Sequence, residues 1–123
     1  MPGQLTALPT PWGRVDVPVN VNELAVSLKQ PWKPVVAAEA NEFQLKVVRL
    51  EGEFPWHTHE AEDELFYCLT GSFRIENEGA MSVTLSSGDT YVVPAGTRHR
   101  PVADQPAVAL LFERAETKQY GDA

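Results

Sequence analysis

The chain has 123 residues, 43% of them hydrophobic and 22% charged, which suits one globular domain with a respectable core. Its formal net charge of −7 and its lack of a basic run argue against nucleic acid or an anionic membrane as a partner, because phosphates repel an acidic chain. A single cysteine, Cys68, excludes an internal disulfide, and without a signal-peptide pattern or a bilayer-length apolar run we expect a cytoplasmic protein.

Residues 1–19 carry four prolines and two glycines, which disfavours a helix or a central strand because proline fixes φ and removes a backbone donor. Two interpretations stay open for this segment. It is either a flexible arm, or an extended strap over the domain or a partner subunit in which Trp12 is the anchor.

Residues 20–30 place apolar side chains at the i, i+3, i+4 and i+7 positions of one helical face. Asn20 or Asn22 can cap the start of this helix, and Pro31 stops it. We therefore expect one short helix whose apolar stripe packs against the outside of the domain.

From residue 35 onward, short β-rich runs alternate with turn residues, as in a barrel or a sandwich. Connections too short for helical crossovers predict antiparallel pairing. The change of apolar parity between Val47 and Val48 predicts a bulge or a strand covered on both faces. The predicted runs cover residues 35–39, 43–51, 54–58, 64–70, 72–77, 81–85, 90–93, 98–103 and 107–113.

Runs 64–70 and 107–113 are apolar on both parities, which predicts strands that are buried on both faces. One face fills the barrel, and the other needs the helix or a second subunit, so we expect a homodimer. The tryptophans available for such contacts are Trp12, Trp32 and Trp56.

Three histidines and one glutamate are expected to converge in this barrel. His57 and His59 are two residues apart, so a strand points both imidazoles to the same face. Glu64 opens the next run after a short acidic link, and His99 follows a stiff Pro-Ala-Gly turn in a later run. Three neutral imidazoles and one carboxylate suit one divalent transition metal ion per chain, and this ligand set does not discriminate among Fe, Mn, Ni, Co, Cu and Zn.

Two stretches of the chain resemble the paired motifs of the cupin family. The first reads Gly52, four residues, His57-Thr58-His59, four residues, Glu64, six residues, Gly71. The second reads Gly88, five residues, Pro94-Ala95-Gly96, two residues, His99, three residues, Ala103. The family pattern has five residues after its first glycine and an asparagine at its last position, so the chain departs from it at both ends. All of the expected ligand positions are filled.

The resemblance covers roughly residues 35–113, and it implies that the four convergent side chains hold the metal ion. It also implies an all-β fold, the antiparallel cupin-type β-barrel or double-stranded β-helix of jelly-roll type, here with one short N-terminal helix. The chain looks most similar to small single-domain cupins, some of them labelled mannose-6-phosphate-isomerase-like. Function varies widely among cupins, so the fold does not select a reaction.

The carboxylate of the site has rivals in Glu60, Glu62 and Asp63. Asp63 has the opposite parity to Glu64 and would turn the other face of run 64–70 inward. Because Glu64 matches the family motif, we expect Glu64 to be the ligand and the three rivals to be solvated.

The predicted organisation is an arm over residues 1–19, a barrel domain with a leading helix over 20–114, and a polar tail over 115–123 that frays. Our first expectation for function is a metal-dependent dioxygenase or related oxidoreductase acting on a small molecule. The expected pocket is mostly apolar, with Phe66, Cys68, Phe73 and Ile75 in its wall.

The alternatives are a non-catalytic small-molecule-binding or sensor cupin, a sugar isomerase, and a metal-stabilised structural barrel. A sugar isomerase needs a base and many polar groups, which the predicted cavity lacks. Arg98 and Arg100 flank His99 in a strand and should point away from it, as charges on the rim or surface.

Overall fold

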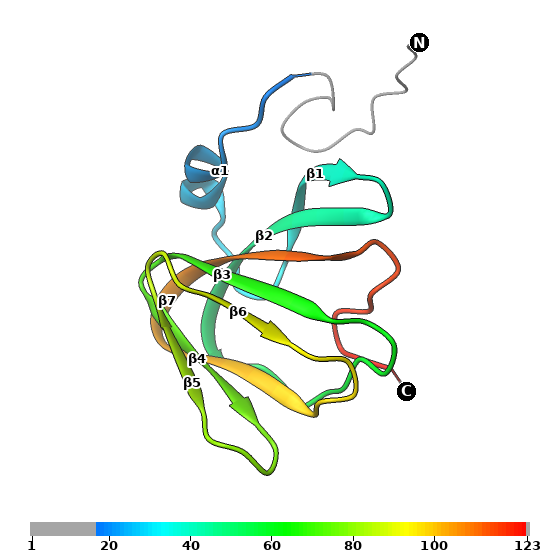
Figure 1. Ribbon diagram of the computed structural model, residues 1–123. Coiled ribbons are helices and arrows are strands. Elements are labelled where there is room, and N and C mark those ends of the chain that lie inside the picture. The colour runs from blue at the N-terminus through cyan, green and yellow to red at the C-terminus, as the bar shows by residue number, and fades with distance from the viewer. Residues whose placement is uncertain (1–16, 123) are drawn as a thin grey trace.

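The computed structural model describes residues 17–122, so residues 1–16 and 123 lie outside the described part. The predicted anchor Trp12 and nearly all of the predicted arm fall on those outside residues. The described residues form one helix and seven strands (Figure 1). Between residues 17 and 122, no helix combines the length and the apolar character that crossing a bilayer requires.

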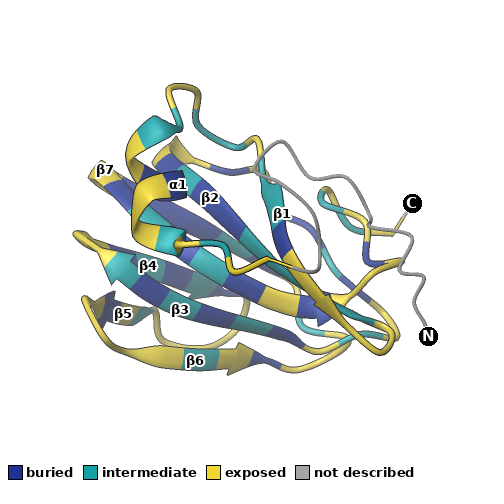
Figure 2. Cartoon of the chain, turned by 90° about the horizontal axis from the view of Figure 1, so that it is seen from above, coloured by how far each residue is buried: buried dark blue, intermediate teal, exposed yellow. Residues whose placement is uncertain are grey.

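The helix α1 spans Val21–Ser27 and lies within the range predicted for it. The side chain of Asn20 accepts a hydrogen bond from the Glu23 amide at 3.0 Å and so caps the first turn. The buried Leu24 and Ala25 pack against Ala37 and Val47 on the outside of the sheet. Figure 2 shows α1 lying over the strands with its outward face exposed.

The strands pair antiparallel throughout, as predicted, and follow the order β1-β2-β7-β3-β6, while β4 pairs with β7 and β5. The long strand β7 pairs with β2, β3 and β4 and curls the sheet into a barrel-like shape. Hydrogen bonds do not close this sheet within residues 17–122. The strands are β1 Val35–Ala40, β2 Phe43–Glu53, β3 Glu64–Thr70, β4 Ser72–Asn77, β5 Val83–Ser86, β6 Thr90–Val93 and β7 His99–Arg114.

The predicted runs differ from the structure in two main places. Residues 54–58, predicted as a strand, are a loop that makes only one isolated β-bridge, between His57 and His99. Pro55 has no amide hydrogen to donate to a neighbouring strand, and the chain turns away after the bridge. Runs 98–103 and 107–113 are one continuous strand, β7. The turn-like residues between them form a bulge, where the partners of β7 shift from Ala103 opposite Gly52 to Ala107 opposite Leu50.

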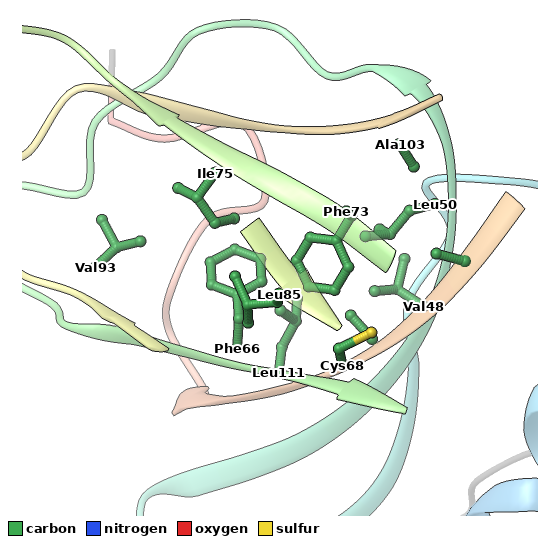
Figure 3. Packing of buried hydrophobic residues seen from close by; sticks show 12 residues of the cluster. Val48, Leu50, Phe66, Cys68, Phe73, Ile75, Leu85, Val93, Ala103 and Leu111 are labelled. Atoms are coloured by element: carbon green, nitrogen blue, oxygen red, sulfur yellow. The ribbon is translucent and has the colours of Figure 1, made fainter. Parts of the chain in front are cut away.

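The inner core fills the barrel-like sheet (Figure 3). Val48 belongs to this inner cluster, whereas the preceding Val47 packs outward beneath α1. The change of parity in β2 therefore marks a strand covered on both faces, which was one of the two predictions for it. The buried members of the inner cluster are Val48, Leu50, Phe66, Cys68, Phe73, Ile75, Leu85, Val93, Ala103, Ala107, Ala109 and Leu111.

The C-terminal segment after Arg114 was expected to fray, and that expectation is wrong for residues 115–122. The amide of Asp122 donates to the Thr58 carbonyl at 2.9 Å, and Tyr120 stacks on Phe54 with ring centroids 4.8 Å apart. The segment thus lies against the loop that carries His57 and His59. The polar sequence of this segment does not indicate this packing, because backbone hydrogen bonds supply much of the contact and they do not depend on side-chain type.

Substitution of Gly121 by alanine is expected to detach this segment. Gly121 has φ +83°, and an added Cβ would lie 2.7 Å from the Thr58 carbonyl oxygen. Gly79 has a similar φ of +76° with no atom within 4 Å of such a Cβ, so Gly79→Ala reports the backbone strain alone. We expect urea denaturation to show Gly121→Ala about 1 kcal/mol less stable than Gly79→Ala. Equal stabilities would mean that the segment is loosely held.

Candidate metal centre

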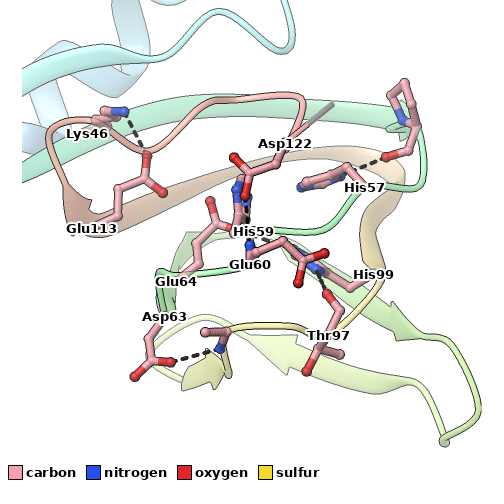
Figure 4. A network of polar contacts seen from close by, with 12 residues as sticks. Lys46, His57, His59, Glu60, Asp63, Glu64, Thr97, His99, Glu113 and Asp122 are labelled. Carbon is pink, nitrogen blue, oxygen red and sulfur yellow. Dashed lines mark hydrogen bonds and ion pairs between the residues drawn. The ribbon is translucent and has the colours of Figure 1, made fainter.

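The structure brings His57, His59, Glu64 and His99 together in one buried cluster (Figure 4). Each side chain offers one ligand atom, and these atoms all lie within 4.8 Å of one another. Three of the residues lie in the stretch 57–64 and the fourth, His99, begins β7, and an isolated β-bridge between His57 and His99 joins the two segments. The His57 amide donates to the His99 carbonyl at 3.0 Å, and the His99 amide donates to the His57 carbonyl at 2.9 Å.

The rival carboxylate Asp63 has a different task. Its Oδ1 accepts a hydrogen bond from the Ala95 amide at 2.8 Å, while the Gly96 amide donates to the His59 carbonyl at 2.8 Å. These bonds fasten the turn before His99 to the histidine loop. Glu64 is buried in β3 with the inward parity expected for it, whereas Asp63 is exposed.

Backbone carbonyls hold two of the imidazoles in defined orientations. His57 Nδ1 lies 2.8 Å from the Pro55 carbonyl oxygen, and His99 Nδ1 lies 2.9 Å from the Thr97 carbonyl oxygen. A carbonyl can only accept, so Nδ1 of each ring carries the hydrogen and donates it. The Nε2 atom of each neutral ring then keeps a free lone pair, the arrangement usual for metal-binding histidines.

His59 supplies the test of whether these residues fit a metal ion. Both of its ring nitrogens are buried, and neither has a hydrogen-bond partner among residues 17–122. Its Nε2 is 3.5 Å from Glu64 Oε1, at the limit of a hydrogen bond. A buried polar atom without a partner is destabilising, and a cation bound between the imidazoles and Glu64 would satisfy one of the two His59 ring nitrogens. The donor set therefore fits a first-row divalent ion.

The pKa values of the cluster follow from burial and from the single carboxylate. Burial lowers the pKa of His57 to about 4, with the other two imidazoles adding to the effect, so this ring is neutral at pH 7. Burial also lowers the pKa of His59, but the Glu64 carboxylate outweighs it and raises this pKa above its ordinary value. Burial alone would raise the pKa of Glu64, yet the adjacent His59 and His99 imidazoles hold it well below its usual range.

The low pKa of His57 predicts a pH dependence of stability in the metal-free protein. Between pH 4 and 6.5 the unfolded chain binds a proton at His57 that the folded chain does not, so the contribution of His57 to stability rises with pH across this window. The full shift corresponds to about 3 kcal/mol, and we expect about 2 kcal/mol because solvent screens part of the ring. Urea denaturation with a chelator present should show this rise in the stability of the wild type relative to His57→Gln, since the opposing effect of the raised pKa of Glu113 is common to both proteins. Parallel curves would contradict it.

A cavity of about 40 Å³ adjoins the cluster, and His57 and Glu64 form part of its wall. Phe66 lines the cavity as expected. Cys68, Phe73 and Ile75, which were also expected there, instead pack in the inner core. The other lining residues are Trp32, Pro34, Lys46, Val48, Leu50, Phe54, Pro101, Leu111, Glu113 and Gln119.

The cavity wall includes two charged residues that sequence reasoning missed, Lys46 and Glu113. Burial raises the pKa of Glu113 to about 8, and the nearby Glu64 carboxylate adds to this effect. Neither residue belongs to a recognisable motif. The sequence pattern could have indicated that Glu113 points inward, since Glu113 has the same parity along β7 as the inward-facing apolar residues Ala109 and Leu111.

Arg98 and Arg100 lie on the outside, as predicted. Their guanidinium groups sit over the Trp56 ring, at 5.2 and 4.9 Å from its centroid. Arg98 pairs with Glu78 at 3.2 Å and Arg100 with Glu76 at 2.9 Å. These contacts leave both arginines away from the cluster of His57, His59, Glu64 and His99.

Comparison with known proteins agrees with this geometry. A cupin-2 domain containing protein of Shewanella frigidimarina is 36% identical, with a TM-score of 0.75 over 78% of this chain and 93% of that one. The uncharacterized protein YdbB of Bacillus subtilis is 27% identical over 80% of this chain and 88% of its own length.

A more distant structure, hydroquinone 1,2-dioxygenase from Sphingomonas sp. TTNP3 with 4-hydroxybenzoate bound, is 21% identical. Its TM-score is 0.69 over 83% of this chain and 75% of that one, a likeness that shows the fold alone. The family model described as Cupin domain (Cupin_2) matches residues 46–113, more than half of the chain. These residues hold all four members of the buried cluster, and the chain belongs to this cupin domain family.

Proposed function

We propose that this cupin is a metal-dependent oxidoreductase of the dioxygenase type that acts on a small molecule. The ion is held by His57, His59, Glu64 and His99. The observation that carries the proposal is the convergence of four buried ligand atoms within 4.8 Å of one another beside a mostly apolar cavity. The ligand set contains no thiolate, which suits Fe, Mn, Ni, Co, Cu or Zn.

A first-row ion bound here supplies Lewis acidity and, when it is redox-active, electron exchange with dioxygen. The protein's own contribution is positional. The Pro55 and Thr97 carbonyls fix two imidazoles, and Glu64 adds the one negative charge of the set. Phe54 and Phe66 in the cavity wall give a substrate an apolar surface to pack on beside the centre.

The lining of the cavity favours a compact, partly apolar substrate. It offers few hydrogen-bonding groups for the many hydroxyls of a sugar, so a sugar isomerase is a weaker candidate than an oxidoreductase. The fold is shared with hydroquinone 1,2-dioxygenase, so hydroquinone is a reasonable addition to the compounds tested. Diketones, catechols and flavonols complete the panel.

Oxygen uptake by the protein loaded with Fe(II) tests the proposal. We expect at least one compound to support uptake, and we expect His57→Ala to abolish it. Thr58→Ala is the matched control, because Thr58 lies between the two histidines of the loop and is outside the cluster. Tight binding of a compound without turnover under any of the six metals would replace the proposal with a binding or sensor function.

Assembly as a homodimer forms a second part of the proposal. Leu45, Phe112, Leu65 and Val92 are aligned across β2, β7, β3 and β6 by the strand registers. Phe112 and Val92 in this row are exposed, which suits contact with a second copy. Light scattering is expected to give a dimer that Phe112→Asp shifts to monomer, whereas a wild-type monomer at micromolar concentration would contradict it.

A further inference from the structure

Two charged side chains stand in the otherwise apolar part of the cavity wall. Lys46 and Glu113 point inward, and the exposed fractions of their side chains are 13% and 2%. Lys46 Nζ lies 2.7 Å from Glu113 Oε2 (Figure 4). Val48 and Leu50 share the inward face of β2 with Lys46, and Leu111 shares that of β7 with Glu113.

The pair is only partly satisfied by the protein. Glu113 Oε1 is buried and receives no hydrogen bond from a donor in the described part of the chain, and the neighbouring Glu64 carboxylate is itself an acceptor. The Lys46 ammonium has three hydrogens, of which the bond to Glu113 uses one. A donor and an unpartnered acceptor are therefore available side by side on the cavity wall.

Stability gives no reason to bury such a pair here. Replacing a buried ion pair by apolar residues of similar size is often neutral or stabilising, because buried charges lose their hydration, and the Lys46 ammonium bears this cost in either form of Glu113. The ion pairs of Arg74 with Glu76 and of Arg100 with Glu76 lie at the outer surface, where water solvates them. An incompletely paired lysine and glutamate on a cavity wall are instead suited to contact a ligand.

We propose that Lys46 and Glu113 bind a hydroxyl group of the substrate, so that the site prefers compounds that carry this hydroxyl over those that lack it. This inference rests on the proposed function, because it concerns the substrate of the same centre. A hydroxyl accepts from the Lys46 ammonium and donates to Glu113 Oε1, whereas a carbonyl can only accept. A hydroxyl also fits either form of Glu113, since it donates to a carboxylate and accepts from a carboxylic acid.

The position and size of the cavity narrow the class of substrate. Glu113 is close enough to Glu64 for the two carboxyl groups to interact, so the hydroxyl site lies beside the metal centre. The cavity of about 40 Å³ has room for only a small part of a substrate. That part is a compact hydroxy-carbonyl group, with an oxygen for the metal and a hydroxyl on a neighbouring carbon.

Two neutral probes of the same carbon number test this assignment, 3-hydroxy-2-butanone and 2-butanone, which lacks the hydroxyl. Zinc-loaded protein is titrated with each probe and followed by NMR, since zinc has no redox chemistry and binding is then measured without turnover. We expect the hydroxyl to strengthen binding at least about tenfold, as expected for hydrogen bonds to charged groups. Lys46→Met and Glu113→Gln should each reduce that ratio to about threefold or less.

Lys118→Met is the matched control, because Lys118 is exposed and lies outside the cavity wall. It should keep the wild-type ratio. Equal affinity of the wild type for the two probes would overturn the inference. An affinity ratio that stays at the wild-type value in both Lys46→Met and Glu113→Gln, each binding one zinc ion per chain, would also overturn it. Crystals of the wild type soaked with 3-hydroxy-2-butanone give a second test that needs no variant. The hydroxyl should lie within hydrogen-bond distance of Lys46 Nζ or Glu113 Oε1, and density elsewhere would contradict it.

The two proposals fail in different ways. Failure of the hydroxyl site leaves metal binding and oxygen uptake by the Fe(II) protein intact. Failure of the oxidoreductase proposal leaves the discrimination between the probes in place while oxygen uptake is absent.

Discussion

Replacement of His99 by alanine is expected to weaken binding of a divalent metal ion by at least about 100-fold, since even an outer partner of a ligand is worth 10–100-fold. His99 is fully buried, and its Nε2 lies 3.2 Å from Glu64 Oε1. Its removal deletes one of the three candidate imidazole ligands and leaves a polar space that water can enter. Competition with a chromophoric chelator measures the affinity directly.

Asn77→Ala provides the control for this variant. Asn77 is buried on β4 directly opposite His99 in the strand register, but its side chain donates to the Tyr91 hydroxyl and is not one of the four cluster residues. We expect its metal affinity to remain within about threefold of wild type. A His99→Ala protein with wild-type affinity and an unchanged circular dichroism spectrum would show that His99 is not a ligand.

Truncation of Leu24 to alanine is expected to cost about 2–5 kcal/mol of unfolding free energy. Leu24 of α1 is 0% exposed and packs with Val47 on the outside of the sheet, so the deletion leaves a cavity beneath the helix. Val26 on the same helix is 78% exposed, and Val26→Ala should change stability by less than about 0.5 kcal/mol. Urea denaturation measures both variants. Similar small losses in the two would mean that α1 is not docked as the structure shows.

Local patterns predicted much of the sheet. The run predicted over 64–70 coincides with β3, and those over 72–77 and 90–93 coincide with β4 and β6. Each of these strands lies between turn residues and is short enough for the turns to define both ends. The inward parity of Glu64 was likewise predictable, because it shares its face with Phe66.

The features that could not be predicted from the sequence depend on contacts between segments far apart in the chain. Residues 115–122 are polar, and only the position of Thr58 and Phe54 in the fold gives them a surface to pack on. Lys46 and Glu113 are 67 residues apart and meet because β2 and β7 are neighbours. No local motif marks such a pair. The convergence of the four candidate ligands was foreseen because two linked motifs, rather than a single pattern, specified them.

Anomalous diffraction from crystals of the zinc-loaded protein, collected above and below the zinc absorption edge, tests the central claim most directly. We expect one anomalous peak per chain, bounded by the imidazoles of His57, His59 and His99 and by the Glu64 carboxylate. Zinc bound at any other position, with no peak among these four side chains, would contradict it.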